Sequence, residues 1–321
     1  MPFCLQWVWP IPLALCAYLA PESPWNAVRR GKIETARHSI ARLRSAEPDS
    51  EEVEAALAYV QHITRLETAE VNGATFLDCF RGTNLRRTEI NCVVWAAQIL
   101  CGNAILGYSV VFLQAAGFNE TQSLDLNIAL SACYIVGGVI CWFRKFALLD
   151  DGLTAVFPRV GRATIYMSGL AIMLVALIVS GGLAFSNTRE INIAIGVLFI
   201  FQTLVNMSTV GPACYPIVAE TPSGKLRYKT IVIGRFVYNL TGVFSNILTP
   251  RMVNKTAWNW GAHTAWFYAG TNALCLLWCW FRLPETKDRP FGEIDLLFEA
   301  RVPARKFRIT TVDRECPRRG A

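Results

Sequence analysis

Uncharged amide side chains lie inside the long apolar stretches of this sequence. Gln98 and Asn103 occur in an uncharged run, residues 90–119, and Asn239 occurs in a later run, 230–250. In a bilayer such amides cost free energy unless they face a protein interior. An amide can donate and accept hydrogen bonds, which suits a neutral, hydroxyl-rich ligand, but amides also join helices to one another. The residues alone leave both roles open.

A second group of residues interrupts one of the apolar stretches. The uncharged run 191–219 ends with Gly211, Pro212 and Pro216, and Glu220 and a basic turn follow it. Proline lacks an N–H donor and collides with the preceding helical turn. Inside a membrane bundle a break is tolerated where neighbouring helices or a cavity satisfy the freed backbone groups, and broken helices often border binding sites. We therefore expect a broken helix beside a cavity.

The distribution of charge predicts the elements that carry these residues. Hydrophobic residues make up 53% of the chain and charged residues 17%, whereas soluble domains average about 25% charged residues. A helix that spans a bilayer needs roughly 20 apolar residues. Seven runs with at most one charge have about this length: 1–21, 90–119, 126–143, 163–188, 191–219, 230–250 and 256–281. The sequence therefore predicts an all-α membrane protein with about seven transmembrane helices, because soluble helices alternate polar and apolar faces.

The basic residues predict the orientation of these helices. Of the 31 Lys and Arg, 28 fall on one set of alternating connectors, at residues 21–89, 144–162, 225–235 and 282–321. Positive charge is retained on the cytoplasmic side of a membrane. We therefore expect an integral multi-pass protein with a cytoplasmic C-terminus. The net charge of +7 reflects this asymmetry, so no nucleic-acid partner is expected.

The first part of the chain divides into a span and a linker. Residues 1–20 lack the basic start of a signal peptide, and Pro10 and Pro12 interrupt their apolar core, so a transmembrane span is expected. Residues 21–89 are too charged to cross a bilayer and are expected to form a cytoplasmic linker of helices. One helix begins at Pro24. A second carries an apolar stripe formed by Val53, Leu57, Val60 and Ile63.

The rest of the chain is expected to be a helical bundle, residues 90–283, followed by a cytoplasmic tail, 284–321. The stretch 144–156 resembles an insert and has no clear structural signal. Arg235 lies near the start of its run, where its long side chain can reach the cytoplasmic surface. Asn119 and Asn254 are formal acceptors for N-glycosylation.

No group of residues points to catalysis. The 11 cysteines and three histidines are scattered, without the spacing of a zinc or redox site. Neither a nucleophile elbow nor a phosphate-binding loop motif occurs. We therefore expect no enzyme activity, no cofactor and no metal ion.

Five motifs, in order along the chain, resemble those of one family. They are PESPW at 21–25, Gln98 with Asn103, Gly161 with Arg162, GPACYPIVAE at 211–220 with Arg227, and PETKDRPFGEID at 284–295. Together they resemble the sugar-porter branch of the major facilitator superfamily, and LRYKTIVIGR and WNWGA further resemble fungal maltose and α-glucoside permeases. The family fold has twelve spans, in two six-helix halves around a central sugar site, and transport is commonly driven by proton symport.

The resemblance implies roles for individual residues. The sugar-binding residues are expected to be Gln98, Asn103, Tyr215 and Asn239. Gly211 and Pro212 are expected to let the broken helix bend. A gate on the cytoplasmic side is expected to consist of Gly161, Arg162, Glu220, Arg227 and Glu285. The implied partners are a mono- or disaccharide, protons, and the lipid bilayer of the plasma membrane.

The resemblance extends to part of the family fold. By this resemblance, residues 1–20 correspond to the sixth span of the family and residues 90–283 to its C-terminal six-helix half. The first five spans are then expected to be absent. One of them holds the carboxylate that is implicated in proton coupling in the family. The chain is then expected to be an amino-terminally truncated sugar transporter that does not transport without a complementary half. A membrane sugar sensor that does not transport is the alternative.

Overall fold

The computed structural model describes residues 8–71, 75–108, 119–147, 161–186, 188–254, 256–287, 289, 291–307 and 310. Every regular element within these ranges is helical, as the sequence predicted. The chain divides into two compact units, Met1–Ala74 and Thr75–Ala321. The boundary between the two units lies within the predicted linker, 21–89. The reason is that the short helix η2 (Phe76–Phe80) packs against two helices of the second unit.

The first unit contains a compact group of three helices: α3 (Pro24–Arg29), α4 (Ile33–Arg44) and α5 (Glu51–Val71). Pro24 lies in the first turn of α3, as predicted, where its missing N–H removes no helical hydrogen bond. Ala36 and Ile40 of α4 are buried against α5. The residues of the predicted stripe that are buried on α5 are Val53, Leu57 and Val60.

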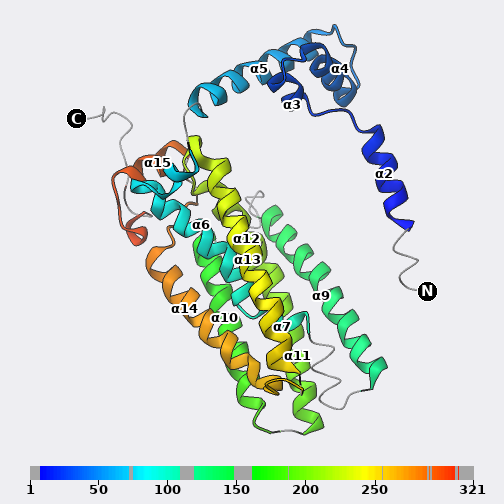
Figure 1. The fold of residues 1–321 in the computed structure, drawn as a ribbon, viewed down its shortest axis with the longest axis vertical. Helices are drawn as coiled ribbons and strands as arrows, with labels where there is room; N and C mark the ends of the chain where they lie inside the picture. The colour runs from blue at the N-terminus through cyan, green and yellow to red at the C-terminus, as the bar shows by residue number, and fades with distance from the viewer. Residues whose placement is uncertain are drawn as a thin grey trace. The chain divides into compact units, whose positions relative to one another are not determined.

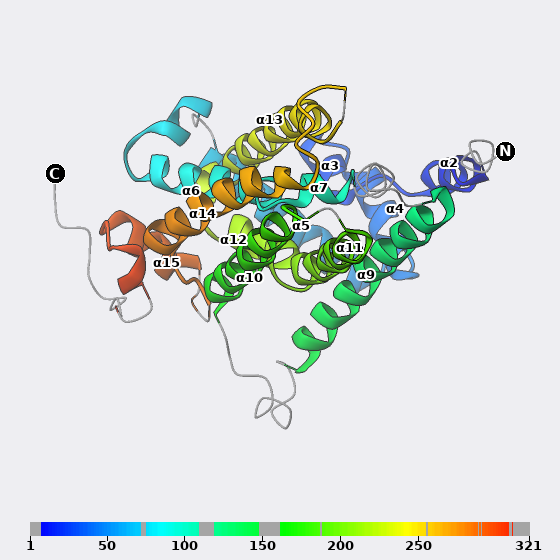
Figure 2. The same cartoon turned by 90° about the horizontal axis from the view of Figure 1, so that it is seen from below.

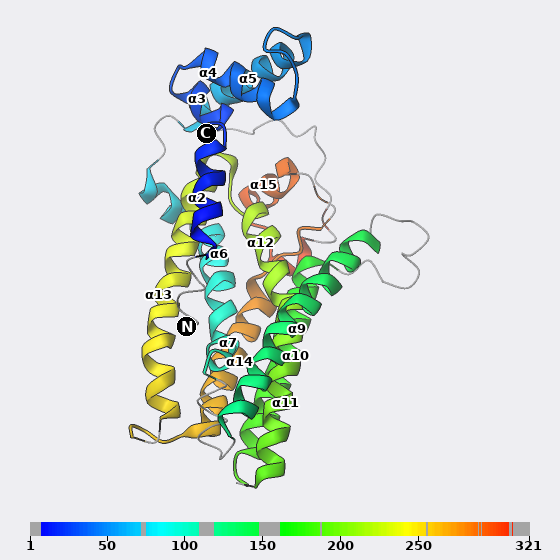
Figure 3. The same ribbon diagram turned by 90° about the vertical axis from the view of Figure 1, so that its right-hand side faces the viewer.

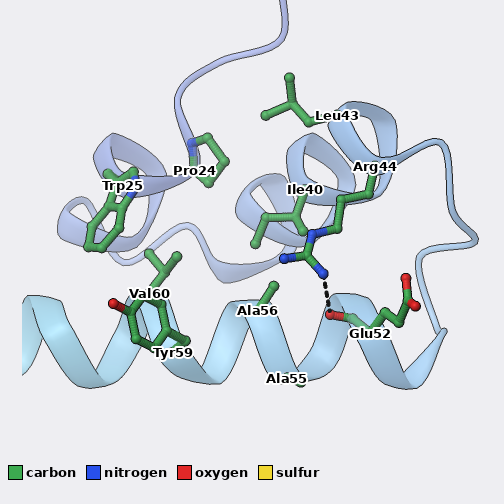
Figure 4. Close-up of a pocket in the computed structure, with 10 residues that line it drawn as sticks. All are labelled: Pro24, Trp25, Ile40, Leu43, Arg44, Glu52, Ala55, Ala56, Tyr59 and Val60. Carbon is green, nitrogen blue, oxygen red and sulfur yellow. Dashed lines mark hydrogen bonds between the residues drawn. The ribbon is translucent and has the colours of Figure 1, made fainter. Parts of the chain in front are cut away.

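An open groove of about 650 Å³ lies among these three helices (Figure 4). Trp25 and Tyr59 line one end of the groove, and Leu43 and Arg44 line the other. The guanidinium of Arg44 donates a hydrogen bond to the backbone carbonyl of Glu52 at 3.5 Å. This bond ties the last turn of α4 to the first turn of α5.

The first predicted span corresponds to a short helix, α2 (Pro10–Leu19), which has 10 residues and buries none of them. Residues 1–7 of the predicted span lie outside the described part of the chain. The described helix is shorter than the roughly 20 residues that cross a bilayer. The span at 1–20 therefore stays a prediction.

The second unit is a bundle of long helices (Figure 1). Its main helices are α6 (Gly82–Leu100), α7 (Asn103–Leu106), α9 (Glu120–Ala147), α10 (Arg162–Leu183), α11 (Arg189–Val205), α12 (Gly211–Glu220), α13 (Arg227–Val253), α14 (Thr264–Arg282) and α15 (Phe291–Glu299). Its short elements are η2, η3 (Asn206–Val210), η4 (Gly224–Leu226), η5 (Gly261–His263) and η6 (Ala304–Lys306).

Within the described residues, five helical stretches are long and apolar enough to cross a membrane. They are Gly82–Leu106, Ser123–Trp142, Arg162–Leu183, Glu190–Glu220 and Gly224–Val253. Each coincides with a predicted run. The last predicted run, 256–281, forms α14, which has 19 residues but is not among the five, since Thr264, Thr271 and Asn272 make it more polar.

The helices of the bundle pack in pairs. α6 lies along α13, α10 along α14, and α9 along α11 (Figures 2 and 3). The largest fully buried side chain of the core is Tyr166 of α10, whose hydroxyl donates to the backbone carbonyl of Val94 on α6 at 2.8 Å. The surrounding core side chains include Ile90, Leu170 and Cys214. The centre of the bundle thus lies between α6, α10 and α12.

Two helices of the bundle are exposed along most of their length. In the stretch Gly224–Val253 only 11% of the most apolar window is buried, and in Ser123–Trp142 the share is 17%. Figure 2 shows α13 and α9 on opposite sides of the bundle. Both helices therefore present broad surfaces that no described residue of the bundle covers.

The run that holds Gln98 and Asn103 is broken between them. α6 ends at Leu100, and α7 begins at Asn103. Gly102 has φ +97°, in the left-handed region that glycine adopts without a steric penalty. A Cβ atom at this position would also lie 2.7 Å from Nε2 of Gln202. The sequence analysis did not anticipate this break.

The expected break at Gly211, Pro212 and Pro216 takes the form of a change in helix type. α11 continues into the π-helical η3, and α12 follows directly. The Gly211 N–H donates to the Asn206 carbonyl, the spacing of five residues that defines a π turn. Pro212 lies in the first turn of α12 and Pro216 within it. The helical path is therefore continuous, and bending at Gly211 and Pro212 stays a prediction.

The predicted insert at 144–156 lies largely outside the described part of the chain. Residues 144–147 form the end of α9, and 148–160 are not described.

Candidate functional site

A polar hollow of about 400 Å³ lies between α7 and α13. Its lining is uncharged and consists of Ile99, Asn103, Ala104, Tyr238, Asn239, Gly242, Val243, Ser245 and Asn246. Asn103 and Asn239, two of the four predicted sugar-binding residues, thus line the same hollow. Asn246 adds a third amide, from the same helix as Asn239. Three amides and a tyrosine give the hollow several hydrogen-bond donors and acceptors and no fixed charge.

The interruption of the helix at Gly102 determines the position of Asn103. Because α6 ends before Gly102, which has a positive φ, Asn103 is the first residue of α7 and does not continue the α6 helix. Its Oδ1 atom is buried and has no hydrogen-bond partner among the described residues. A buried acceptor without a partner costs free energy.

Gln98 lies outside this hollow. Its Nε2 donates to the backbone carbonyl of Gly211 at 3.3 Å, so the side chain joins α6 to the start of α12. Of the two roles that the sequence left open for this amide, the structure shows the contact between helices.

Tyr215 belongs to a group of aromatic rings beside the hollow. Its side chain is 59% exposed, and its ring meets that of Trp95 edge-on, with centroids 5.4 Å apart. Trp95 also meets Tyr238 edge-on at 5.4 Å, and Tyr238 lines the hollow. Trp95 therefore connects the predicted Tyr215 to the hollow through a ring that the sequence analysis did not single out.

Arg235 lies over the same rings. Its Cζ atom is 4.8 Å from the ring centroid of Trp95 and 4.4 Å from that of Tyr238. Cation–π contacts of this kind contribute roughly 0.5–2 kcal/mol. The guanidinium of Arg235 thus packs against the two rings beside the bundle, and its reach to the cytoplasmic surface stays a prediction.

A charged cluster gathers three of the predicted gate residues at the other end of the bundle. Arg162 at the start of α10 forms an ion pair with Glu220 at the end of α12. Thr286 donates to Oε2 of Glu220 at 2.8 Å. Glu285 accepts hydrogen bonds from the backbone N–H groups of Arg162 at 2.7 Å and Thr164 at 3.3 Å. The carboxylate of Glu285 thereby satisfies N–H groups of the first turn of α10, which have no partner within the helix.

Gly161, another predicted gate residue, makes room for this arrangement. A Cβ atom at Gly161 would lie 1.8 Å from Oε2 of Glu285, so a larger residue would displace the carboxylate. Arg227, the remaining predicted gate residue, is the first residue of α13. Along α13, Asn239 lies about 18 Å from Arg227, at 1.5 Å per residue, so the hollow is well separated from this helix end.

The site residues that sequence reasoning missed are Trp95, Tyr238 and Asn246. Asn246 follows Asn239 by seven residues, close to two turns, so a search for polar residues at helical spacing around Asn239 would have found it. Tyr238 directly precedes Asn239, and helical spacing from Asn239 does not identify it. Trp95 carries no such signal, because its partners lie on α12 and α13, far along the chain.

These features define the class of the protein. An apolar helical bundle that bears an uncharged polar hollow and a charged cluster at its helix ends is typical of multi-pass membrane proteins of the transporter type. The chain belongs to the family described as "Sugar (and other) transporter", which matches residues 1–298.

Curated relatives support this assignment. The chain is 37% identical over 316 residues to the general alpha-glucoside permease of Saccharomyces cerevisiae, a match that covers 98% of this chain and 49% of the permease. It is 34% identical over 316 residues to the maltose permease MAL61 of the same yeast, which covers 98% and 50% of the two chains. The chain thus spans about half the length of the curated relatives it matches. The predicted resemblance is confirmed.

Solved structures show the same fold. The proton:xylose symporter XylE bound to 6-bromo-6-deoxy-D-glucose matches with a TM-score of 0.61 and 19% identity, over 88% of this chain and 56% of that one. The inward-open conformation of XylE from E. coli matches with a TM-score of 0.62 and 18% identity, over 88% and 53%. The predicted major facilitator fold is therefore confirmed.

Proposed function

We propose that the hollow between α7 and α13 forms one side of a binding site for an α-glucoside that is transported across the membrane. The observation that carries the proposal is the chemistry of the lining, in which Asn103, Asn239 and Asn246 are uncharged amides within an apolar bundle. Small-molecule sites combine apolar and aromatic walls with a few such polar groups. The names of the yeast relatives, α-glucoside and maltose permeases, support an α-glucoside as the ligand.

The hollow requires a second wall. Asn239 and Asn246 lie on α13, most of which is not covered by the described residues. Amides are costly in contact with lipid. We therefore propose that a complementary transporter half covers this face, and that the chain does not transport sugar without it.

The charged cluster supports a mechanism of alternating access. Transporters of this kind rock one half against the other around a central site. We propose that Arg162, Glu220 and Glu285, together with Arg227, close the cytoplasmic side in one of the two states. Likeness to a proton:xylose symporter supports coupling to protons. The basic connectors support a cytoplasmic C-terminus, and we propose the plasma membrane from the likeness to yeast permeases.

Uptake of radiolabelled maltose tests the proposal. The chain is expressed in a transporter-null yeast strain, either alone or with the N-terminal half of the general alpha-glucoside permease. We expect saturable uptake with both halves and none with the chain alone, and Asn239→Ala serves as an inactive control. Uptake by the chain alone would overturn the need for a second half. Maltose binding without uptake in either strain would favour a sensor.

A further inference from the structure

Asn246 occupies a second position on the wall of the hollow. It follows Asn239 by seven residues, close to two turns of α13, so the two side chains lie on one face of the helix about 10 Å apart along its axis. Both residues line the hollow. Asn103 on α7 lies across from this face. The amides are therefore spread along the hollow instead of converging on one point.

The backbone at Asn246 is held by an unusual contact. Pro250 lies four residues further along α13 and has no N–H, so the carbonyl of Asn246 lacks its usual donor within the helix. The hydroxyl of Tyr108, just beyond the end of α7, donates to this carbonyl at 3.4 Å. This contact joins the α7 side of the hollow to α13 at the level of Asn246.

The polar groups near Asn246 fall into two sets. Thr249 is buried and shares a hydrogen bond of 2.7 Å with the hydroxyl of Tyr268 on α14, so its polar atom is satisfied inside the bundle. Within the described part of the chain, the side-chain amide of Asn246 has no hydrogen-bond partner, and it is exposed to the hollow. An unpaired amide in an apolar stretch marks a surface that faces protein, water or ligand, and not lipid.

We propose that Asn246 determines specificity by hydrogen-bonding the second ring of a two-ring α-glucoside whose first ring lies between Asn103 and Asn239. The inference rests on the proposed function, since it assumes that the hollow binds sugar. The spacing of the two amides on α13 matches a ligand that extends along the helix. A single-ring sugar held at Asn103 and Asn239 would not reach Asn246.

Binding measurements with two sugars test this assignment. The full chain is purified together with the N-terminal half of the general alpha-glucoside permease in lipid nanodiscs, and the affinities of the pair for maltose and for methyl α-D-glucoside are measured by isothermal titration calorimetry. Asn246→Ala is expected to weaken maltose binding about fivefold to tenfold, the loss of one hydrogen bond, and to leave methyl α-D-glucoside binding unchanged. Asn239→Ala is expected to weaken both. Asn246→Gln, which retains the amide, is expected to recover part of the maltose affinity.

Asn127 provides a matched control for the Asn246 variants. Asn127→Ala makes the same chemical change on α9, outside the hollow, and is expected to alter neither affinity. If the unmodified chain binds maltose but Asn246→Ala changes neither affinity, or weakens both equally, the second-ring role is overturned while the proposed function stands. If the unmodified chain, paired with the N-terminal half, binds neither sugar, the proposed function and this inference both fail.

Discussion

The carboxylate of Glu285 lies against the first turn of α10, where it accepts a hydrogen bond from the backbone N–H of Arg162 at 2.7 Å. The two residues are 123 positions apart in the chain. Glu285 thus caps the N-terminus of α10 from a different segment of the chain. Its negative charge interacts favourably with the positive end of the helix dipole. The same helix turn carries the Arg162 side chain that pairs with Glu220.

Glu285→Ala is expected to destabilise the protein by about 1–2 kcal/mol, because it removes a cap and a favourable charge from α10. The corresponding fall in Tm is about 2–8 °C, measured by fluorescence during thermal unfolding in detergent. Glu285→Gln retains an oxygen acceptor and is expected to lose less. Equal Tm values for the unmodified protein and Glu285→Ala would show that the cap does not stabilise the fold.

Gly161→Ala is expected to have an effect similar in size to that of Glu285→Ala. The new Cβ atom would lie 1.8 Å from the Glu285 carboxylate and would push it away from the helix. The Gly161→Ala/Glu285→Ala double variant should therefore lose little more stability than either single variant, since both remove the same interaction. Additive losses in a double-mutant cycle would contradict this. Gly182→Ala, where a Cβ atom meets open space, is the control.

Arg162→Ala, in a complete transporter, is expected to weaken the state in which the cytoplasmic side is closed. The pair with Glu220 is partly exposed, with side-chain exposures of 38% and 23%, so its loss is expected to cost about 0.5–1 kcal/mol. A cysteine placed at Ser223, next to the cluster, should then react a few times faster with a soluble thiol reagent. The Ser223→Cys variant with Arg162 intact is the reference. An unchanged labelling rate would contradict the gate role.

Asn103→Ala and Gln98→Ala are expected to separate sugar binding from helix packing. The Oδ1 atom of Asn103 is buried without a partner, so its removal should weaken sugar binding and leave stability unchanged or slightly higher. Gln98 donates to the Gly211 carbonyl, so its removal should lower stability by about 1 kcal/mol. Tm and maltose affinity, measured on the same preparations, test both. A reversed pattern would mean that Gln98 is the ligand contact and Asn103 the structural one.

The sequence predicts the long helices well because their physical cause is local. An uncharged run of about 20 residues has one stable form in a bilayer, and five of the predicted runs are apolar helices of sufficient length in the structure. The stripe on α5 was likewise predictable, since Val53, Leu57 and Val60 recur at helical spacing and are buried. The polar helix α14 was harder to assess, because its character depends on partners such as Leu170, whose carbonyl accepts from Asn272 at 3.1 Å.

The break at Gly102 and the aromatic group could not be predicted in this way. A single glycine in an apolar run is compatible with a continuous helix, and neither its φ of +97° nor its close approach to Gln202, a hundred residues further along the chain, can be read from local sequence. In the same way, Trp95, Tyr215 and Tyr238 come from three helices, and their contacts follow from the packing of the bundle. The sequence shows that Gln98 and Asn103 are amides within an apolar run. Only the packing of the helices shows that Asn103 lines the hollow and that Gln98 does not.

The π turn at Asn206–Val210 has a consequence for the rotational phase of the helix that follows it. A π turn accommodates about one residue more than an α turn, and one residue corresponds to about 100° of rotation. The faces of α12 are therefore offset from those of α11 as if one residue had been inserted between them. Conversion of the π turn to an α turn with no residue deleted would therefore turn Tyr215 away from Trp95, whereas deleting a single residue, such as Ser208, would keep Tyr215 on the same face.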